Sequence, residues 1–225
     1  MRPEFLIAYS SFGSVFIPLT IALIQWKKMW DDFKPLCIIL ILSLATDLIS
    51  ILFIQYSNNP NTNTYLIGNI YLIAQFSLLV LVFRKQLPNQ RIIDVILVLF
   101  IFFCIINILL FQGPWIFNSV SNVVASLILM SFCMFYFYRL LHDLPIVHVQ
   151  QLPMLWISFA VLTYYAGNFF IFLVKNYLTY GESGSHKLMW ILHNLLNITK
   201  NILFAIALWQ SYRSVKSSIL SSSAP

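Results

Sequence analysis

Long runs of apolar residues separated by short polar segments dominate the chain. Seven of these runs are about 20 residues long, the length of a helix that crosses the hydrocarbon core of a bilayer. A disordered tail is predicted for residues 210–225, which are rich in serine. The pattern predicts seven transmembrane helices near residues 5–26, 36–56, 64–83, 92–112, 117–139, 153–175 and 187–209.

The composition also indicates a membrane protein. The chain has 225 residues, of which 60% are hydrophobic and 9% are charged, and its mean hydropathy is +0.84. Soluble domains carry about 25% charged residues. We therefore expect an all-α integral membrane protein, a single seven-helix bundle with no appended soluble domain and with the lipid bilayer as its surroundings. Cys37, Cys104 and Cys133 lie singly in apolar runs, which does not fit a metal site or a disulfide framework.

The basic residues are distributed unevenly between the two sides of the predicted bundle. Because Lys and Arg are enriched on the cytoplasmic side of membrane proteins, this asymmetry predicts an outside N-terminus and a cytoplasmic C-terminus. The net charge of +6 therefore reflects topology, and no nucleic-acid partner is expected. Nine basic residues fall on the predicted cytoplasmic side and three on the other: Lys27, Lys28, Lys34, Arg84, Lys85, Arg91, Arg139, Arg213 and Lys216 against Arg2, Lys175 and Lys187.

Two opposite charges lie deep inside predicted spans. Lys200 is in the middle of the last apolar run, and Asp47 is the only carboxylate well inside any span. Counted from the predicted cytoplasmic helix ends, both residues lie about 14–16 Å into the membrane. Because a lone charge in hydrocarbon is costly, we expect Asp47 and Lys200 to form an ion pair. Such a pair would be either a structural clamp between two helices or part of a functional site.

Further polar residues occur on the neighbouring predicted helices and on the helical arc of Lys200. Five predicted helices each present a polar stripe, and the stripes meet at a similar depth. We therefore predict a polar cavity at mid-membrane, rimmed by aromatic residues and open toward the outside. The predicted ligand-binding residues are Asp47, Tyr71, Gln75, Tyr164, His193, Asn197, Lys200 and Asn201.

Several functions fit such a site. We favour a small-molecule sensor or receptor-like protein that signals through a cytoplasmic or membrane partner at loop 140–152. A small-solute or proton-coupled transporter is the alternative, because coupled transport often uses an intramembrane Asp and Lys. A lipid-modifying enzyme is a further alternative, but Asp47 alone makes no acid–base pair and no catalytic residues are assigned. No metal site is expected, since His193 has no second His or Cys at its depth.

The lysine midway along the last helix also suggests a retinal-type pigment. Seven helices, an outside N-terminus and such a lysine resemble the microbial rhodopsins, and a buried lysine is suited to forming a Schiff base. The rhodopsin pattern has an Asp four residues before the lysine, where this chain has Leu196. It also has an acidic counterion on the third helix and a Trp-x-x-x-Pro on the sixth, and both are missing here. We therefore predict no cofactor, with retinal at Lys200 as a minor alternative.

Three segments resemble sequences of small seven-helix inner-membrane proteins of Gram-negative bacteria: TDLIS (Thr46–Ser50), IGNIYLIAQF (Ile67–Phe76) and WILHNLLNITKNILFAIALW (Trp190–Trp209). The resemblance implies a location in the bacterial cytoplasmic membrane and a link to signalling. It assigns no role to the polar residues inside these segments.

Overall fold

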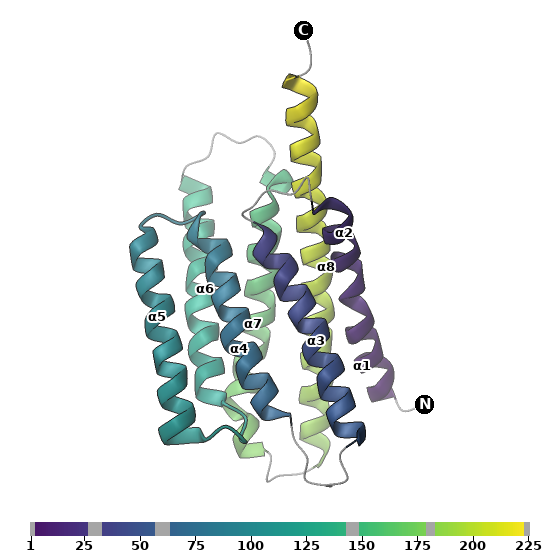
Figure 1. Cartoon of the computed structure of the whole chain (residues 1–225), viewed down its shortest axis with the longest axis vertical. Coiled ribbons are helices and arrows are strands. Elements are labelled where there is room, and N and C mark those ends of the chain that lie inside the picture. The colour runs from purple at the N-terminus through teal and green to yellow at the C-terminus, as the bar shows by residue number, and fades with distance from the viewer. Residues whose placement is uncertain (1–2, 27–32, 57–63, 143–148, 179–182, 223–225) are drawn as a thin grey trace.

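The computed structural model describes residues 3–26, 33–56, 64–142, 149–178 and 183–222. Within these ranges the chain is helical and contains no β-strand, and its helices run side by side in one bundle (Figure 1). In this part of the chain, seven helices are long and apolar enough to cross a membrane, which fits a multi-pass membrane protein, and the predicted all-α architecture is confirmed.

The seven spans begin within about four residues of the predicted positions, as expected for boundaries read from hydropathy. The first span is formed by two helices and the fourth continues through a π-helical turn, Asn107–Gln112. The helices are α1 (Pro3–Ser14), α2 (Phe16–Gln25), α3 (Lys34–Tyr56), α4 (Tyr65–Arg84), α5 (Gln90–Ile106), α6 (Ser119–His142), α7 (Pro153–Leu178) and α8 (Ser183–Ser222).

Helix α8 corrects the prediction of a disordered tail. It has 40 residues and continues through Ser222, so residues 210–222 are helical. The serine content of this segment suggested disorder, but extending a helix that has already formed orders only one residue at a time. At 1.5 Å per residue, α8 is about 60 Å long, and it projects beyond the other helices at one end of the bundle (Figure 1).

The break between α1 and α2 follows from Pro18. Proline has no N–H to donate to the carbonyl four residues earlier, and its ring conflicts with that carbonyl. The α-helical hydrogen-bond pattern is accordingly interrupted at Val15, whose N–H donates to the carbonyl of Phe12 at 3.4 Å while its backbone angles stay α-helical. The Ser14 hydroxyl donates to the carbonyl of Ser11 at 2.6 Å, which supports the same turn.

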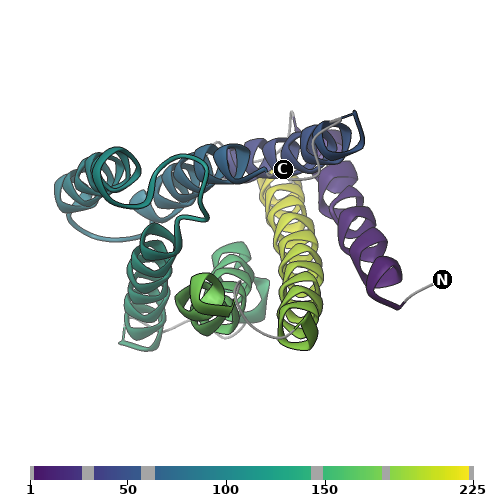
Figure 2. The same ribbon diagram turned by 90° about the horizontal axis from the view of Figure 1, so that it is seen from below.

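The helices enclose a central space. Contacts between successive neighbours join α2, α3, α4, α6, α7 and α8 into a closed ring, and α1 packs against α8 while α5 packs against α4 outside the ring (Figure 2). We call the end of the bundle at which α1, α4, α6 and α8 begin the N-terminal end, and the other the C-terminal end (Figure 1). Toward the C-terminal end, fully buried apolar side chains fill the bundle interior, including Leu36, Leu40, Leu79, Phe83, Phe204 and Leu208.

The close approach of α7 and α8 depends on Gly167. A Cβ atom at this position would lie 2.6 Å from both terminal methyl carbons of Leu196. We expect Gly167→Val to lower the free energy of unfolding by about 1–3 kcal/mol, because it overpacks this contact. Denaturant titration in detergent micelles measures the change. The matched control is Gly13→Val on α1, where an added Cβ meets no atom within 4 Å.

The same contact offers a rescue experiment. Adding Leu196→Ala to Gly167→Val removes the methyl groups that the new side chain would meet. The double variant is expected to be more stable than the sum of the two single changes predicts. Purely additive losses of stability in the double variant would contradict the contact between residue 167 and Leu196.

Candidate functional site

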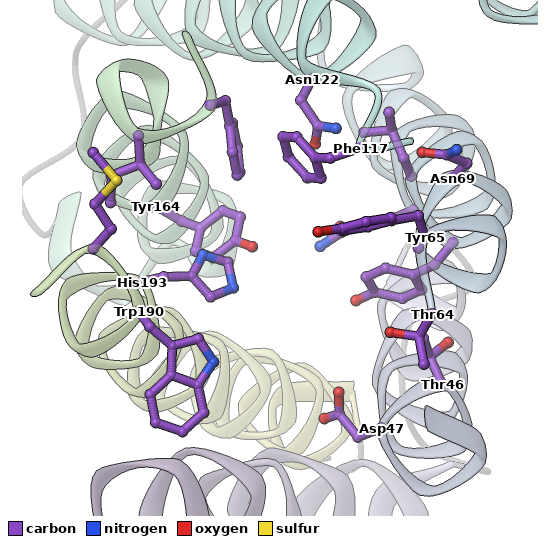
Figure 3. Close-up of a pocket in the computed structure, with 17 residues that line it drawn as sticks. Thr46, Asp47, Thr64, Tyr65, Asn69, Phe117, Asn122, Tyr164, Trp190 and His193 are labelled. Atoms are coloured by element: carbon purple, nitrogen blue, oxygen red, sulfur yellow. The ribbon is translucent and has the colours of Figure 1, made fainter. Parts of the chain in front are cut away.

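A cavity of about 320 Å³ lies inside the ring, and its lining extends to Thr64 and Phe117 at the N-terminal end of the bundle. Its volume is at the lower end of the range for small-molecule sites, which is about 300–1,000 Å³. Helices α3, α4, α6, α7 and α8 and the α5–α6 connection all contribute side chains (Figure 3). The lining residues are Thr46, Asp47, Thr64, Tyr65, Gly68, Asn69, Tyr71, Leu72, Gln75, Phe117, Asn122, Tyr164, Ile171, Phe172, Met189, Trp190 and His193.

A series of ring contacts follows the cavity wall, and we call its members the aromatic collar: Tyr65, Phe117, Phe172, His193 and Tyr164. The Tyr65 and Phe117 ring centroids are 6.3 Å apart, and those of Phe117 and Phe172 are 6.0 Å apart. His193 lies 6.3 Å from Phe172 and 5.9 Å from Tyr164. These separations suit edge-to-face and tilted packing, so the collar is a preformed apolar wall with polar edges.

The deeper part of the cavity is polar, and we call Asp47, Tyr71 and Gln75 its floor. Among the residues that the structure describes, none forms a hydrogen bond with the Asp47 carboxylate or an ion pair with it within 4.0 Å. The Tyr71 hydroxyl is buried and lies near the Ser43 hydroxyl and the Asp47 carboxylate. Gln75 is buried on the next turn of α4. The floor therefore presents polar groups that a bound molecule can satisfy.

Lys200 is close to the cavity but does not line it. Its side chain is only 4% exposed, and its Nζ atom lies 4.3 Å from the centroid of the Tyr164 ring. A desolvated cation over an aromatic face gains about 2 kcal/mol. Asp47 and Lys200 lie within electrostatic range of each other, yet no contact within 4.0 Å joins them. The predicted direct ion pair is therefore wrong.

The positions of the two helices explain this difference. Helix α3 packs against α2 and α4, whereas α8 packs against α1, α2 and α7. Asp47 and Lys200 thus reach the ring from separate sides. Counting residues from the helix ends gave their depth along the membrane normal but not their lateral separation.

Asn197 and Asn201 lie outside the cavity. The amide of Asn197 donates to the Ser11 hydroxyl at 2.9 Å, and the amide of Asn201 donates to the Ser14 hydroxyl at 2.8 Å. Both bonds attach α8 to α1. On a helix these two residues are rotated by about 40° and 80° from His193, which is enough to turn them from the cavity to the neighbouring helix.

His193 is held in a defined orientation. The Asn168 amide nitrogen donates to the carbonyl of Tyr164 at 2.8 Å, which leaves the Asn168 side-chain oxygen as an acceptor. That oxygen lies 2.7 Å from Nδ1 of His193, so Nδ1 carries a proton and donates it. The imidazole ring faces the cavity beside Tyr164 (Figure 3). Asn168 therefore positions His193 without lining the cavity itself.

The structure thus brings together five of the eight predicted ligand-binding residues: Asp47, Tyr71, Gln75, Tyr164 and His193 line one cavity. The sequence analysis missed much of its wall, in particular the residues on the α5–α6 connection. The Asn69 amide lies 3.3 Å from the carbonyls of both Pro114 and Ile116 and so holds Phe117 near the cavity. An asparagine inside an apolar run was the available signal for Asn69, whereas nothing local marked Phe117.

The cavity does not offer a metal site. Within the described ranges, no three His, Cys, Asp or Glu side chains lie close enough together to share a metal ion. Its chemistry is that of carboxylate, amide, hydroxyl, imidazole and aromatic groups. These groups are suited to holding a small molecule by hydrogen bonds, charge and ring contacts.

Comparisons with known proteins do not assign the chain to a family. No protein-family model, no curated protein and no solved structure matches it significantly.

Proposed function

We propose that the protein is a receptor-like sensor in the membrane, which binds a small molecule in the cavity and transmits binding along α8. The observation that carries this proposal is the course of α8. Met189, Trp190 and His193 on this helix line the cavity, and the same helix continues without a break to Ser222 beyond the C-terminal end of the bundle. A shift of α8 caused by a bound molecule would therefore also displace its far end.

The shape of the interior favours sensing over transport. A transporter exposes its site to both sides of the membrane in turn. Here, fully buried apolar residues such as Phe76 and Phe204 fill the space between the cavity floor and the C-terminal end. Transport remains the second candidate, because Asp47 and Lys200 are opposite intramembrane charges that do not contact each other.

The proposal includes an orientation. Under the positive-inside rule, the C-terminal end of the bundle faces the cytoplasm and the cavity opens to the outside. Following the resemblance of its sequence, we place the protein in the bacterial inner membrane. A cytoplasmic or membrane signalling protein would then contact the far end of α8; residues 143–148 of the loop considered for this role lie outside the described residues. Six basic residues support the orientation: Lys34, Arg84, Lys85, Arg91, Arg139 and Arg213.

A cavity-filling variant tests the proposal. Gly68 lines the cavity, and a Cβ atom added there meets nothing within 4 Å, so Gly68→Phe fills the cavity without a backbone clash. Gly13→Phe is the matched control, because Gly13 is equally open and lies outside the cavity. Spin labels at Tyr138→Cys on α6 and Arg213→Cys on α8 report the distance at the C-terminal end, and both positions are exposed.

We use three probes that differ in charge: 2-phenylethylamine, 2-phenylethanol and 3-phenylpropionate. At least one of them is expected to change the measured distance distribution in lipid nanodiscs for the wild type and for Gly13→Phe. The change should be lost in Gly68→Phe. A distance distribution that no probe alters would contradict sensing, and uptake of a probe into proteoliposomes would indicate transport instead.

A further inference from the structure

We infer that the cavity selects an organic cation, namely a small primary amine with an aromatic or other apolar body. This inference rests on the proposed binding of a small molecule in the cavity and adds the chemical class of that molecule. Three features carry it: the charge of the lining, the polar groups of the floor and the aromatic faces of the wall.

Asp47 is the only charged side chain among the lining residues. Its carboxylate faces the cavity, and within the described part of the chain no ion pair within 4.0 Å neutralises it (Figure 3). Taking a carboxylate out of bulk water is costly unless a cation and hydrogen-bond donors surround it. A ligand ammonium supplies both, since it carries a positive charge and up to three N–H donors.

The other charge near the cavity does not oppose this assignment. Lys200 does not line the cavity, and its ammonium lies over the face of Tyr164. A molecule that enters from the N-terminal end therefore meets the Asp47 carboxylate rather than the Lys200 ammonium. The Tyr71 hydroxyl, which is buried near Ser43, provides a hydrogen-bond acceptor beside the same carboxylate.

The aromatic wall suits the rest of such a ligand. Tyr65, Phe117, Phe172 and Trp190 line the cavity above the floor. Aromatic faces attract cations, best when water is excluded, and aromatic edges and faces also pack well against an apolar body. The volume of about 320 Å³ suits a molecule of modest size.

Binding measurements with isosteric probes test the class of ligand. The probes are 2-phenylethylamine, 2-phenylethanol, 3-phenylpropionate and phenylalanine, titrated into the purified full chain in nanodiscs by calorimetry. The wild type is expected to bind the amine at least about tenfold more tightly than the alcohol, the size of effect that one desolvated charge contact gives. The anion is expected to bind most weakly.

Two substitutions test whether Asp47 causes the preference for the amine. Asp47→Asn is expected to abolish the preference for the amine, while Asp94→Asn, the same change at a carboxylate paired with Arg84 outside the cavity, leaves it intact. If Asp47→Asn does not fold, the amine-to-alcohol ratio of the wild type still decides the question. A ratio near one overturns the inference.

The remaining outcomes separate this inference from the proposed function. Tighter binding of the alcohol or the anion, lost in Gly68→Phe, would overturn the cation assignment while supporting a small-molecule site. Tighter binding of phenylalanine, weakened by both Asp47→Asn and Lys200→Met, would make the ligand a zwitterion and also overturn it. Binding of every probe unaffected by Gly68→Phe would contradict both proposals.

Discussion

Asp47→Asn is expected to lower the free energy of unfolding by about 2–3 kcal/mol, somewhat less than the loss of one partner of a contacting buried ion pair. The reason is the position of Lys200, which is 4% exposed and lies in the field of the Asp47 carboxylate. Without that carboxylate, the buried ammonium keeps, among the residues that the structure describes, only its contact with the Tyr164 ring. Lys200→Met should cost less, because Asp47 borders the cavity and keeps access to water.

The double variant distinguishes electrostatic coupling from other effects. Asp47→Asn combined with Lys200→Met removes both charges, so its stability should approach that of the wild type. Unfolding in mixed micelles, followed by circular dichroism, measures all three variants. The control is Asp94→Asn, which breaks an exposed ion pair with Arg84 at 2.6 Å and should cost less than about 1 kcal/mol. Strictly additive losses in the double variant would show that the two charges do not interact.

Asn107→Leu is expected to lower the free energy of unfolding by about 2–3 kcal/mol, because it removes the central donor of a buried side-chain hydrogen-bond network. Asn107 is 4% exposed, and its amide nitrogen donates to side-chain oxygens of Gln112 and Ser121, at 3.0 and 3.1 Å, and of Asn118. The Gln112 amide in turn donates to the Ser119 hydroxyl at 3.1 Å. This network joins the end of the fourth span to the start of α6.

Removing the Asn107 network is also expected to affect the cavity. The network fixes both ends of the α5–α6 connection, which carries Phe117 of the aromatic collar. Faster hydrogen exchange in residues 113–122 is therefore expected in Asn107→Leu, together with weaker probe binding. Asn194→Leu is the matched control, because the Asn194 amide donates to the carbonyl of Trp190 within α8 and to no other group in the described ranges. Equal changes in hydrogen exchange and in probe binding in the two variants would contradict the role given to the network.

The number of spans and the approximate start of each could be predicted from the sequence. A run of about 20 apolar residues is a local property, and in a bilayer its backbone groups are satisfied only within a helix. The helical continuation of α8 was not predictable in this way, because polar residues 210–222 are compatible with both helix and disorder.

Part of the cavity was predictable for a similar reason. Polar side chains are costly inside an apolar helix, so Asp47, Tyr71, Gln75, Tyr164 and His193 were recognisable one by one, and their depth followed from residue counting. The contact between the Lys200 ammonium and the Tyr164 ring was not predicted. The spacing of residues on one helix does not identify which residue of another helix faces them.

The set of spans and the position of each polar group along its helix therefore follow from the sequence, since both depend on local hydropathy and helical rise. Which helices are neighbours depends on the packing of the whole bundle. That packing placed Asn197 and Asn201 against α1 instead of the cavity, and it separated Asp47 from Lys200. Helical periodicity gives the direction of a side chain from its own axis, whereas the partner in that direction depends on how the helices pack around one another.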